Sequence, residues 1–167
     1  MICLDACILG HVLVPENSRV AAAEKAASRK LIDRIIKGQT KGCSPTIMIS
    51  ETKWLISRYV NATMPAEVLS RADEVEELLP QVLGTYFRFI DVDFAIAALA
   101  ADFRVEHYSK KNAFSYNDGL YLATASITGC EALVTTDKHL LATQEVPVFT
   151  PSALLAKNKI PADKTAI

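Results

Sequence analysis

Short apolar runs alternate along the chain with longer segments in which apolar residues recur at helical spacing. The short runs predict buried strands at 2–4, 46–49, 87–92, 132–136 and 147–149. The longer segments predict helices at 8–14, 20–36, 50–62, 65–79, 93–107 and 115–128, with Ser50 as the N-cap of the third helix. Because strands and helices alternate, the pattern predicts an α/β fold: a three-layer α/β/α domain with a mostly parallel sheet of four to five strands.

The length and composition favour one folded domain. The chain has 167 residues, of which 50% are hydrophobic, so it can form a sizeable core and is not expected to be disordered. We expect residues 1–155 to form the domain and residues 156–167 to form a polar C-terminal tail. No apolar run approaches the roughly 18 residues of a membrane span, and the first residues do not resemble a signal peptide. We therefore expect a cytoplasmic protein that does not contact membranes.

Four acidic residues occupy equivalent places in this pattern. Asp5 and Asp137 follow apolar strand runs, whereas Glu51 and Asp118 lie in the first turns of predicted helices. In a parallel α/β sheet these places share the edge at the carboxyl ends of the strands. Carboxylates crowded there repel one another, and a hard divalent cation such as Mg²⁺ or Mn²⁺ relieves the repulsion. The sequence therefore predicts a metal site suited to phosphate chemistry.

Each acid also has an ordinary structural explanation. Glu51 and Asp118 would be favoured by the helix dipole or as caps without any ligand, and Asp137 would simply end a strand. Asp5 is harder to explain, because an acid directly after a buried run needs a partner or a metal. Taken together, the four acids favour a metal site. Asp93 also begins a helix after a strand, and we interpret it as an N-cap.

Two segments of the chain carry a family resemblance. The sequence SYNDGLYLATASITG, which begins at Ser115, and the following ALVTTDKHL around Asp137 resemble the C-terminal half of a PIN domain. They are most similar to the VapC-like ribonuclease toxins. The first acid after ICL and the second acid after IMIS fit the N-terminal half. The resemblance covers about residues 1–155, which we therefore expect to form a PIN-like nuclease domain.

The resemblance implies a metal-dependent endoribonuclease that hydrolyses RNA phosphodiester bonds and leaves a 5′-phosphate. One or two Mg²⁺ or Mn²⁺ ions would be held by Asp5, Asp118 and Asp137, with Glu51 bound directly or through water. A metal-bound water supplies hydroxide near neutral pH, so no nucleophilic side chain is required. The resemblance also implies a homodimer that is held inactive by a cognate antitoxin protein.

Near the first acid the chain departs from the PIN pattern. Two residues after this acid, PIN domains often carry Ser, Thr or Asn, but this chain has Cys7, which is a poor hydrogen bonder. We therefore expect weak support for Asp5 from this position. Thr135, two residues before Asp137, keeps a hydroxyl that such domains commonly use near the site. The four cysteines lack zinc spacing, and we expect them to be buried reduced thiols.

Other polar and aromatic residues carry weaker signals. The net charge of −1 excludes a global basic field, so any contact with RNA needs a local patch. The candidates for phosphate contact, which are otherwise solvated surface residues, are Lys53, Arg58, Lys110 and Lys111. We interpret Trp54, Tyr116 and Tyr121 as packing residues rather than platforms on which bases stack.

Two other classes of function are open to an α/β domain with these acids. A haloacid-dehalogenase-like phosphatase would need Asp-x-Asp at the first strand, where this chain has Asp-Ala-Cys. A receiver domain would need an acidic pair near that strand and a lysine after the last one, and neither is present. The remaining alternative is a PIN-like binding module that has lost catalysis and acts in an RNA or protein complex. All four acids are present, which favours the enzyme.

Overall fold

The computed structural model describes residues 1–13, 21–63, 79–81, 83–109 and 113–157, with side chains left undescribed at 56–63. Five strands form one sheet in which all neighbouring strands are parallel. Their bounds are Ile2–Leu4 (β1), Gly42–Pro45 (β2), Phe87–Ile90 (β3), Ala132–Val134 (β4) and Val148–Phe149 (β5). Their order in the sheet is β3-β2-β1-β4-β5. The predicted α/β fold with a mostly parallel sheet is confirmed.

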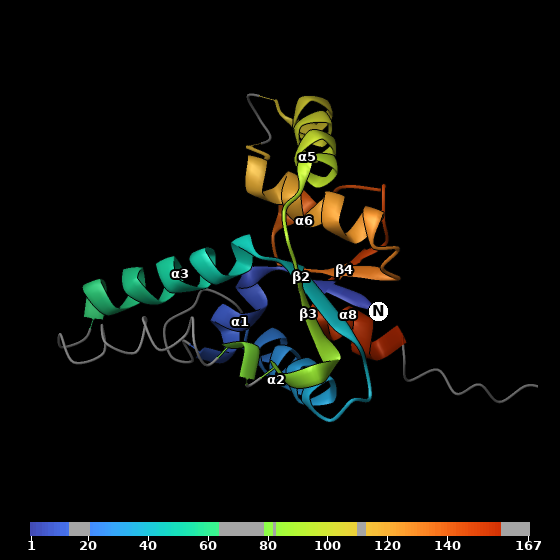
Figure 1. Cartoon of the computed structure of the whole chain (residues 1–167). Coiled ribbons are helices and arrows are strands. Elements are labelled where there is room, and N and C mark those ends of the chain that lie inside the picture. The colour runs from blue at the N-terminus through green and yellow to red at the C-terminus, as the bar shows by residue number, and fades with distance from the viewer. Residues whose placement is uncertain (14–20, 64–78, 82, 110–112, 158–167) are drawn as a thin grey trace, which may run out of the picture.

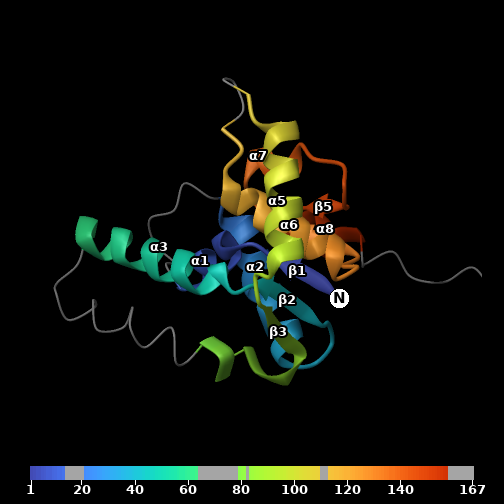
Figure 2. The same cartoon turned by 45° about the horizontal axis from the view of Figure 1, so that its top comes forward.

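Helices cover both faces of this sheet (Figure 1). The helices of the described residues include Ala6–Leu13 (α1), Ala22–Ile36 (α2), Ile47–Thr63 (α3), Phe94–His107 (α5), Tyr116–Ile127 (α6), Lys138–Leu141 (α7) and Pro151–Lys157 (α8). A 3₁₀ turn, Gly84–Tyr86, precedes β3. Helices α5 and α6 pack against each other on one face, while α2 packs against α1 and α8 on the other. Helix α3 projects from the body of the domain, as the turned view in Figure 2 also shows.

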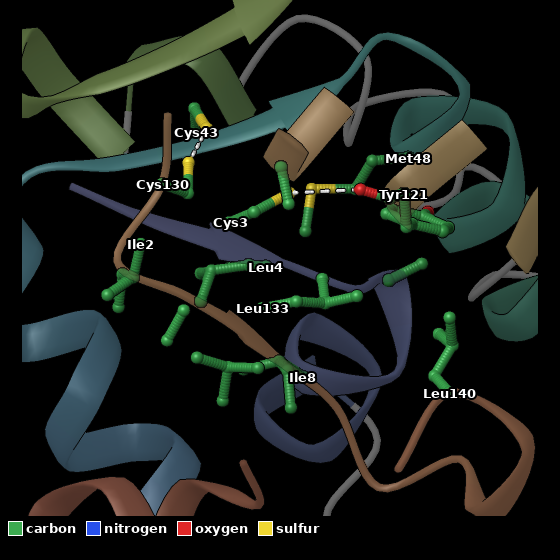
Figure 3. Close-up of a cluster of buried hydrophobic side chains, with 14 of the residues drawn as sticks. Ile2, Cys3, Leu4, Ile8, Cys43, Met48, Tyr121, Cys130, Leu133 and Leu140 are labelled. Carbon is green, nitrogen blue, oxygen red and sulfur yellow. Dashed lines mark hydrogen bonds between the residues drawn. The ribbon is translucent and has the colours of Figure 1, made fainter. Parts of the chain in front are cut away.

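The central strands are buried on both faces. All three residues of β1 and all three of β4 are buried, which explains why they are continuous apolar runs without alternation. Figure 3 shows Leu4 and Leu133 from these two strands packed with Ile8 of α1. The sulfur atoms of Cys43 and Cys130 lie 3.3 Å apart, and all four cysteines are free thiols. This core holds the carboxyl ends of β1 and β4 rigidly side by side.

The predicted strand at 46–49 is wrong. Strand β2 lies earlier, and Ile47 is the first residue of α3. The run from Ile47 to Ile49 is apolar because this helical turn faces the core, where Met48 is fully buried, and such short runs do not distinguish strand from helix. Ser50 is therefore not an N-cap, since its hydroxyl donates to the carbonyl of Ile47 within the helix. Glu51 consequently lies beyond the first turn of α3, where capping does not explain it.

The C-terminal part of the domain contains two helices that the pattern did not predict. The short helix α7 begins directly after Asp137. Helix α8 begins with a proline, which suits the first position of a helix, and packs against α2.

The predicted helix at 65–79 lies almost wholly outside the described residues, and the division of the chain at residue 155 stays a prediction. Among the described residues, no helix has both the length and the apolar character that a membrane span requires.

Candidate functional site

The carboxyl ends of β1 and β4, the second and third turns of α3 and the first turns of α6 surround one open pocket of about 290 Å³. Four carboxylates line it, and we refer to them as the pocket acids: Asp5, Glu51, Asp118 and Asp137. The structure thus brings together the acids that the sequence placed at one sheet edge. They come from four separate segments of the chain, so only the tertiary fold assembles the pocket.

Asp5 is the most buried of the pocket acids, with 8% of its surface exposed. Its Oδ1 accepts from the backbone N–H of Cys7 at 3.2 Å. Its Oδ2 accepts from the hydroxyl of Thr135 at 2.5 Å and from the thiol of Cys7 at 3.2 Å. Burial raises the pKa of Asp5 to about 6, although these hydrogen bonds oppose the shift. Cys7 contacts the carboxylate through both its thiol and its backbone, and the thiol is the weak donor that the sequence predicts.

Thr135 links two of the pocket acids. Its fully buried hydroxyl donates to Asp5 and accepts from the backbone N–H of Asp137 at 2.9 Å. The hydroxyl therefore connects the carboxyl end of β1 to the carboxyl end of β4. Thr135 thus contacts two pocket acids, and its supporting role stays a prediction.

Glu51 is held by two side chains of α6. The amide of Asn117 donates to Oε1 at 2.7 Å, and the hydroxyl of Tyr121 donates to Oε2 at 2.5 Å. Asn117 and Tyr121 lie on one face of α6 because they are four residues apart. Burial, together with the charges of Asp5 and Glu51, raises the pKa of Tyr121 well above its ordinary value, so the phenol keeps its proton and acts as a donor. The aromatic ring is buried as a packing residue would be (Figure 3), but sequence reasoning missed its hydroxyl.

Asp118 and Asp137 both hold the first turn of a helix. Asp118 forms a capping box with Ser115: its Oδ2 accepts from the Ser115 N–H at 2.6 Å, and its own N–H donates to the Ser115 hydroxyl at 3.1 Å. Asp137 caps α7, with its Oδ1 accepting from the N–H of His139 at 2.6 Å. Within the described part of the chain, no hydrogen bond reaches the second oxygen of either carboxylate. Burial raises the pKa of Asp118, and the nearby charge of Asp137 adds to the shift.

The close packing of α5 on α6 sets the position of Asp118. A Cβ atom at Gly119 would lie 2.5 Å from the carbonyl oxygen of Ala100, so only glycine permits this approach. The hydroxyl of Tyr116 also donates to the carbonyl of Ala97 at 3.2 Å. The first turn of α6 is therefore clamped against α5 directly beside the capping box.

The other predicted residues lie in different places. Asp93 is exposed and caps α5, with its Oδ1 accepting from the N–H of Ile96 at 2.9 Å, so the N-cap prediction is confirmed. Lys53 is half-buried on α3 and does not line the pocket, whereas the side chain of Arg58 and both Lys110 and Lys111 lie outside the described residues. The packing interpretation of Trp54 is wrong, because its side chain is 57% exposed and lines the pocket.

The pocket suits a hard cation that is bound in part through water. Its ligand atoms are carboxylate oxygens, which Mg²⁺ and Mn²⁺ prefer, and the raised pKa values of Asp5 and Asp118 indicate that a positive charge would be favourable there. No three of these acids have oxygens within 4.8 Å of one another. Among the described residues, three potential ligand atoms lie within 4.8 Å of one another at Glu106, His107 and Glu145. There, His107 already pairs with Glu145 at 2.7 Å. A cation in the pocket would draw the acids closer or be bridged by water molecules.

Comparison with known proteins identifies a family and a set of similar folds. A family model of the PIN domain matches residues 2–146. A crystal structure of FitAcB from Neisseria gonorrhoeae is 21% identical, with a TM-score of 0.63, over 90% of this chain and 98% of that one. A toxin–antitoxin complex from Klebsiella pneumoniae is 16% identical, with a TM-score of 0.57, over 90% and 98%.

A third similar structure is that of VapC20 from Mycobacterium tuberculosis, described as a toxin that cleaves the sarcin–ricin loop. It is 15% identical, with a TM-score of 0.60, over 88% of this chain and 99% of that one. No curated protein sequence matches the chain significantly. At these identities the three structures establish a common fold over nearly the whole domain.

Proposed function

The chain belongs to the PIN domain family, and from this premise we propose that it is a metal-dependent endoribonuclease that hydrolyses RNA phosphodiester bonds. The observation that carries the proposal is the convergence of the four pocket acids on one open pocket. Two of these acids have raised pKa values, which indicates a carboxylate group that a cation would stabilise. Asp5 is buried, and its raised pKa indicates that its charge opposes folding, so the arrangement favours a catalytic role.

We propose Mg²⁺ or Mn²⁺ as the cofactor. Asp5, Asp118 and Asp137 would hold it, because Asp118 and Asp137 each keep one oxygen outside their capping bonds. Both oxygens of Glu51 already accept hydrogen bonds, so Glu51 would act through a water molecule. When bound, the metal lowers the pKa of a water molecule and neutralises charge that develops on the phosphodiester.

The protein side chains would orient the acids and determine which groups near the pocket are ionised. Thr135 and Cys7 hold the Asp5 carboxylate toward the pocket, and Tyr121 and Asn117 hold Glu51. With a pKa of about 6, Asp5 is mostly ionised at neutral pH and is thus able to bind a cation. The hydroxyl of Tyr121 would stay protonated and would not act as a base.

We further propose that the chain is a VapC-like toxin, that it is neutralised by a cognate antitoxin protein, and that it works in the cytoplasm as a homodimer. The support is the similar fold of a toxin–antitoxin complex and of the VapC20 toxin, together with the motif resemblance around Asp118 and Asp137. Expression of the chain alone in a bacterial host should slow growth. The Asp118→Asn variant should be tolerated at equal protein level.

A cleavage assay tests the proposed activity. The purified protein is incubated with a mixed RNA pool in Mn²⁺, in Mg²⁺ and in a chelator, and the new ends are analysed for 5′-phosphates. We expect cleavage only with the metals, and none from Asp5→Asn. If RNA stays intact in Mn²⁺ and both forms are equally toxic in cells, the non-catalytic binding module becomes the better explanation.

A further inference from the structure

The one tryptophan of the chain lies at the rim of the acidic pocket. Trp54 follows Glu51 by one turn of α3, and its side chain is 57% exposed. It also lines a second, adjoining hollow of about 400 Å³ together with Ile47, Ser50 and Asn117. Glu51 and Trp54 line both hollows, so the indole marks the boundary between the acid site and the space beside it.

Exposure alone does not mark Trp54 as functional, because single apolar residues are common on protein surfaces. Its position does, since an indole has the largest apolar surface of any side chain and more than half of Trp54 is exposed at the edge of a pocket lined by carboxylates. The adjoining hollow combines this aromatic face with the apolar side chain of Ile47 and the polar side chains of Ser50 and Asn117. The side-chain amide of Asn117 donates an N–H to Glu51, and its oxygen is able to accept a hydrogen bond from a ligand.

These features match the requirements of an unpaired nucleobase. Proteins bind single-stranded nucleic acids by stacking bases on aromatic rings and by hydrogen bonds to the base edges. On a helix, residues three apart have Cβ atoms about 5–6 Å from each other, so Trp54 lies within one nucleotide of the acids. We propose that Trp54, with Asn117 at its edge, forms a subsite for the base of an unpaired nucleotide that flanks the scissile phosphodiester.

This inference rests on the proposed nuclease function and assigns recognition of the flanking base to Trp54 and Asn117. A peptide from a protein partner would also fit a hollow with an aromatic wall. Continuity with the acid pocket favours RNA, because a nucleotide presents its phosphate and its base together to the two hollows.

Fluorescence gives a direct test, because all the tryptophan emission comes from Trp54. The Asp118→Asn protein in Mn²⁺ is titrated with single-stranded oligoadenylate, with the same oligomer carrying abasic nucleotides, and with an RNA duplex. We expect quenching by the single strand and little or none by the abasic strand or the duplex, since only an unpaired base can stack. Equal quenching by all three, or none by any, would overturn the subsite.

Cleavage kinetics give an independent test in the wild-type background. Trp54→Ala should raise KM for single-stranded RNA by about 5- to 150-fold, the effect expected for one stacked base, with a smaller change in kcat. Trp54→Phe should restore most of the loss. The matched control is Phe94→Ala on α5, which removes an aromatic side chain that is 89% exposed and lines neither hollow; its KM should not change.

The outcomes separate the two proposals. If the wild-type protein cleaves RNA in Mn²⁺ and Trp54→Ala has an unchanged KM, the subsite is wrong and the nuclease function stands. If no metal-dependent cleavage occurs, the nuclease function fails, and the fluorescence titration still decides whether Trp54 binds bases. Quenching by a partner protein but not by oligoadenylate would assign the hollow to a peptide.

Discussion

The two sides of the acidic pocket hold their carboxylates in different ways. On the side of α6 and α7, Asp118 and Asp137 accept hydrogen bonds from backbone N–H groups at helix starts. On the side of β1 and α3, side chains dominate: Thr135 and Cys7 hold Asp5, and Asn117 and Tyr121 hold Glu51. Only Glu51 lies away from a helix start, because Asp5 also accepts from the Cys7 N–H in the first turn of α1.

This difference shows where the structural signal of function is strongest. Asp118 and Asp137 would be useful as caps even in a protein without a metal site. Glu51 has no such use. Asp5 accepts from the first turn of α1, but burial makes its charge unfavourable, as its pKa of about 6 indicates. The side of the pocket with the less specific sequence motif thus provides the stronger physical argument for a bound cation.

The largest expected effect separates capping from metal binding. Asp118→Asn should lower the Mn²⁺-dependent rate of RNA cleavage more than about 100-fold, because it removes a charge from the proposed metal site. The fold should persist, since the amide oxygen of asparagine is able to accept from the Ser115 N–H as Asp118 does. Initial rates and circular dichroism measure the two effects. Asp93→Asn, which changes a cap outside the pocket, is the control and should keep its activity; similar losses in both variants would refute the distinction.

The stability of the metal-free protein should depend on the protonation of Asp5. Its pKa in the fold is about 6, against an ordinary 3.8, so the proton stabilises the fold. This contribution is present below about pH 4 and is lost as the pH rises through about 6, amounting to about 3 kcal/mol. Asp5→Asn should remove it, so in a chelator the variant should gain stability relative to wild type between these pH values. Urea unfolding at several pH values measures this difference.

Mn²⁺ should restore the folding stability that the wild type loses when Asp5 ionises. A concentration of one hundred times the dissociation constant gives about 2.7 kcal/mol of stabilisation, and Asp5→Asn should not respond. An unchanged melting temperature of the wild type in millimolar Mn²⁺ would count against a metal site. If the free energy of unfolding depended on pH in the same way for the wild type and for Asp5→Asn in a chelator, burial of the Asp5 charge would not destabilise the fold.

A smaller effect is expected from the side chains that hold Glu51. Tyr121→Phe keeps the buried ring and removes only the hydroxyl that donates to Oε2. Groups that orient a metal ligand typically contribute about 10- to 100-fold, so the apparent affinity for Mn²⁺ in the cleavage assay should fall by about that factor. Thermal unfolding in a chelator should change little. If the affinity for Mn²⁺ stays the same, the hydroxyl packs beside Glu51 without positioning it.

The smallest effect is expected at Cys7. Cys7→Ser replaces a weak donor to Asp5 with a stronger one and leaves the backbone N–H in place. A single hydrogen bond contributes about 1 kcal/mol, so cleavage rates should change by no more than about fivefold. A much larger loss would mean that the size or chemistry of sulfur matters at this position.

Local signals were sufficient for one side of the pocket. Asp118 was expected to suit the first turn of a helix as a cap, and it forms a capping box with Ser115. The Asp93 cap and the buried runs of β1 and β4 were also predicted, because caps and continuous apolar runs depend on near neighbours in the chain. The family motif around these residues then indicated the PIN domain.

The tertiary structure decided the other side. The residues from Ile47 to Ile49 are apolar whether they form a strand or a buried helical turn, so only their packing against the core revealed the start of α3. The partners of Glu51 come from α6, and one partner of Asp5 is Thr135, which is 130 residues away in the chain. The exposure of Trp54 likewise follows from where α3 leaves the body of the domain. Contacts between distant segments have no local pattern, because they arise from the way the strands and helices pack.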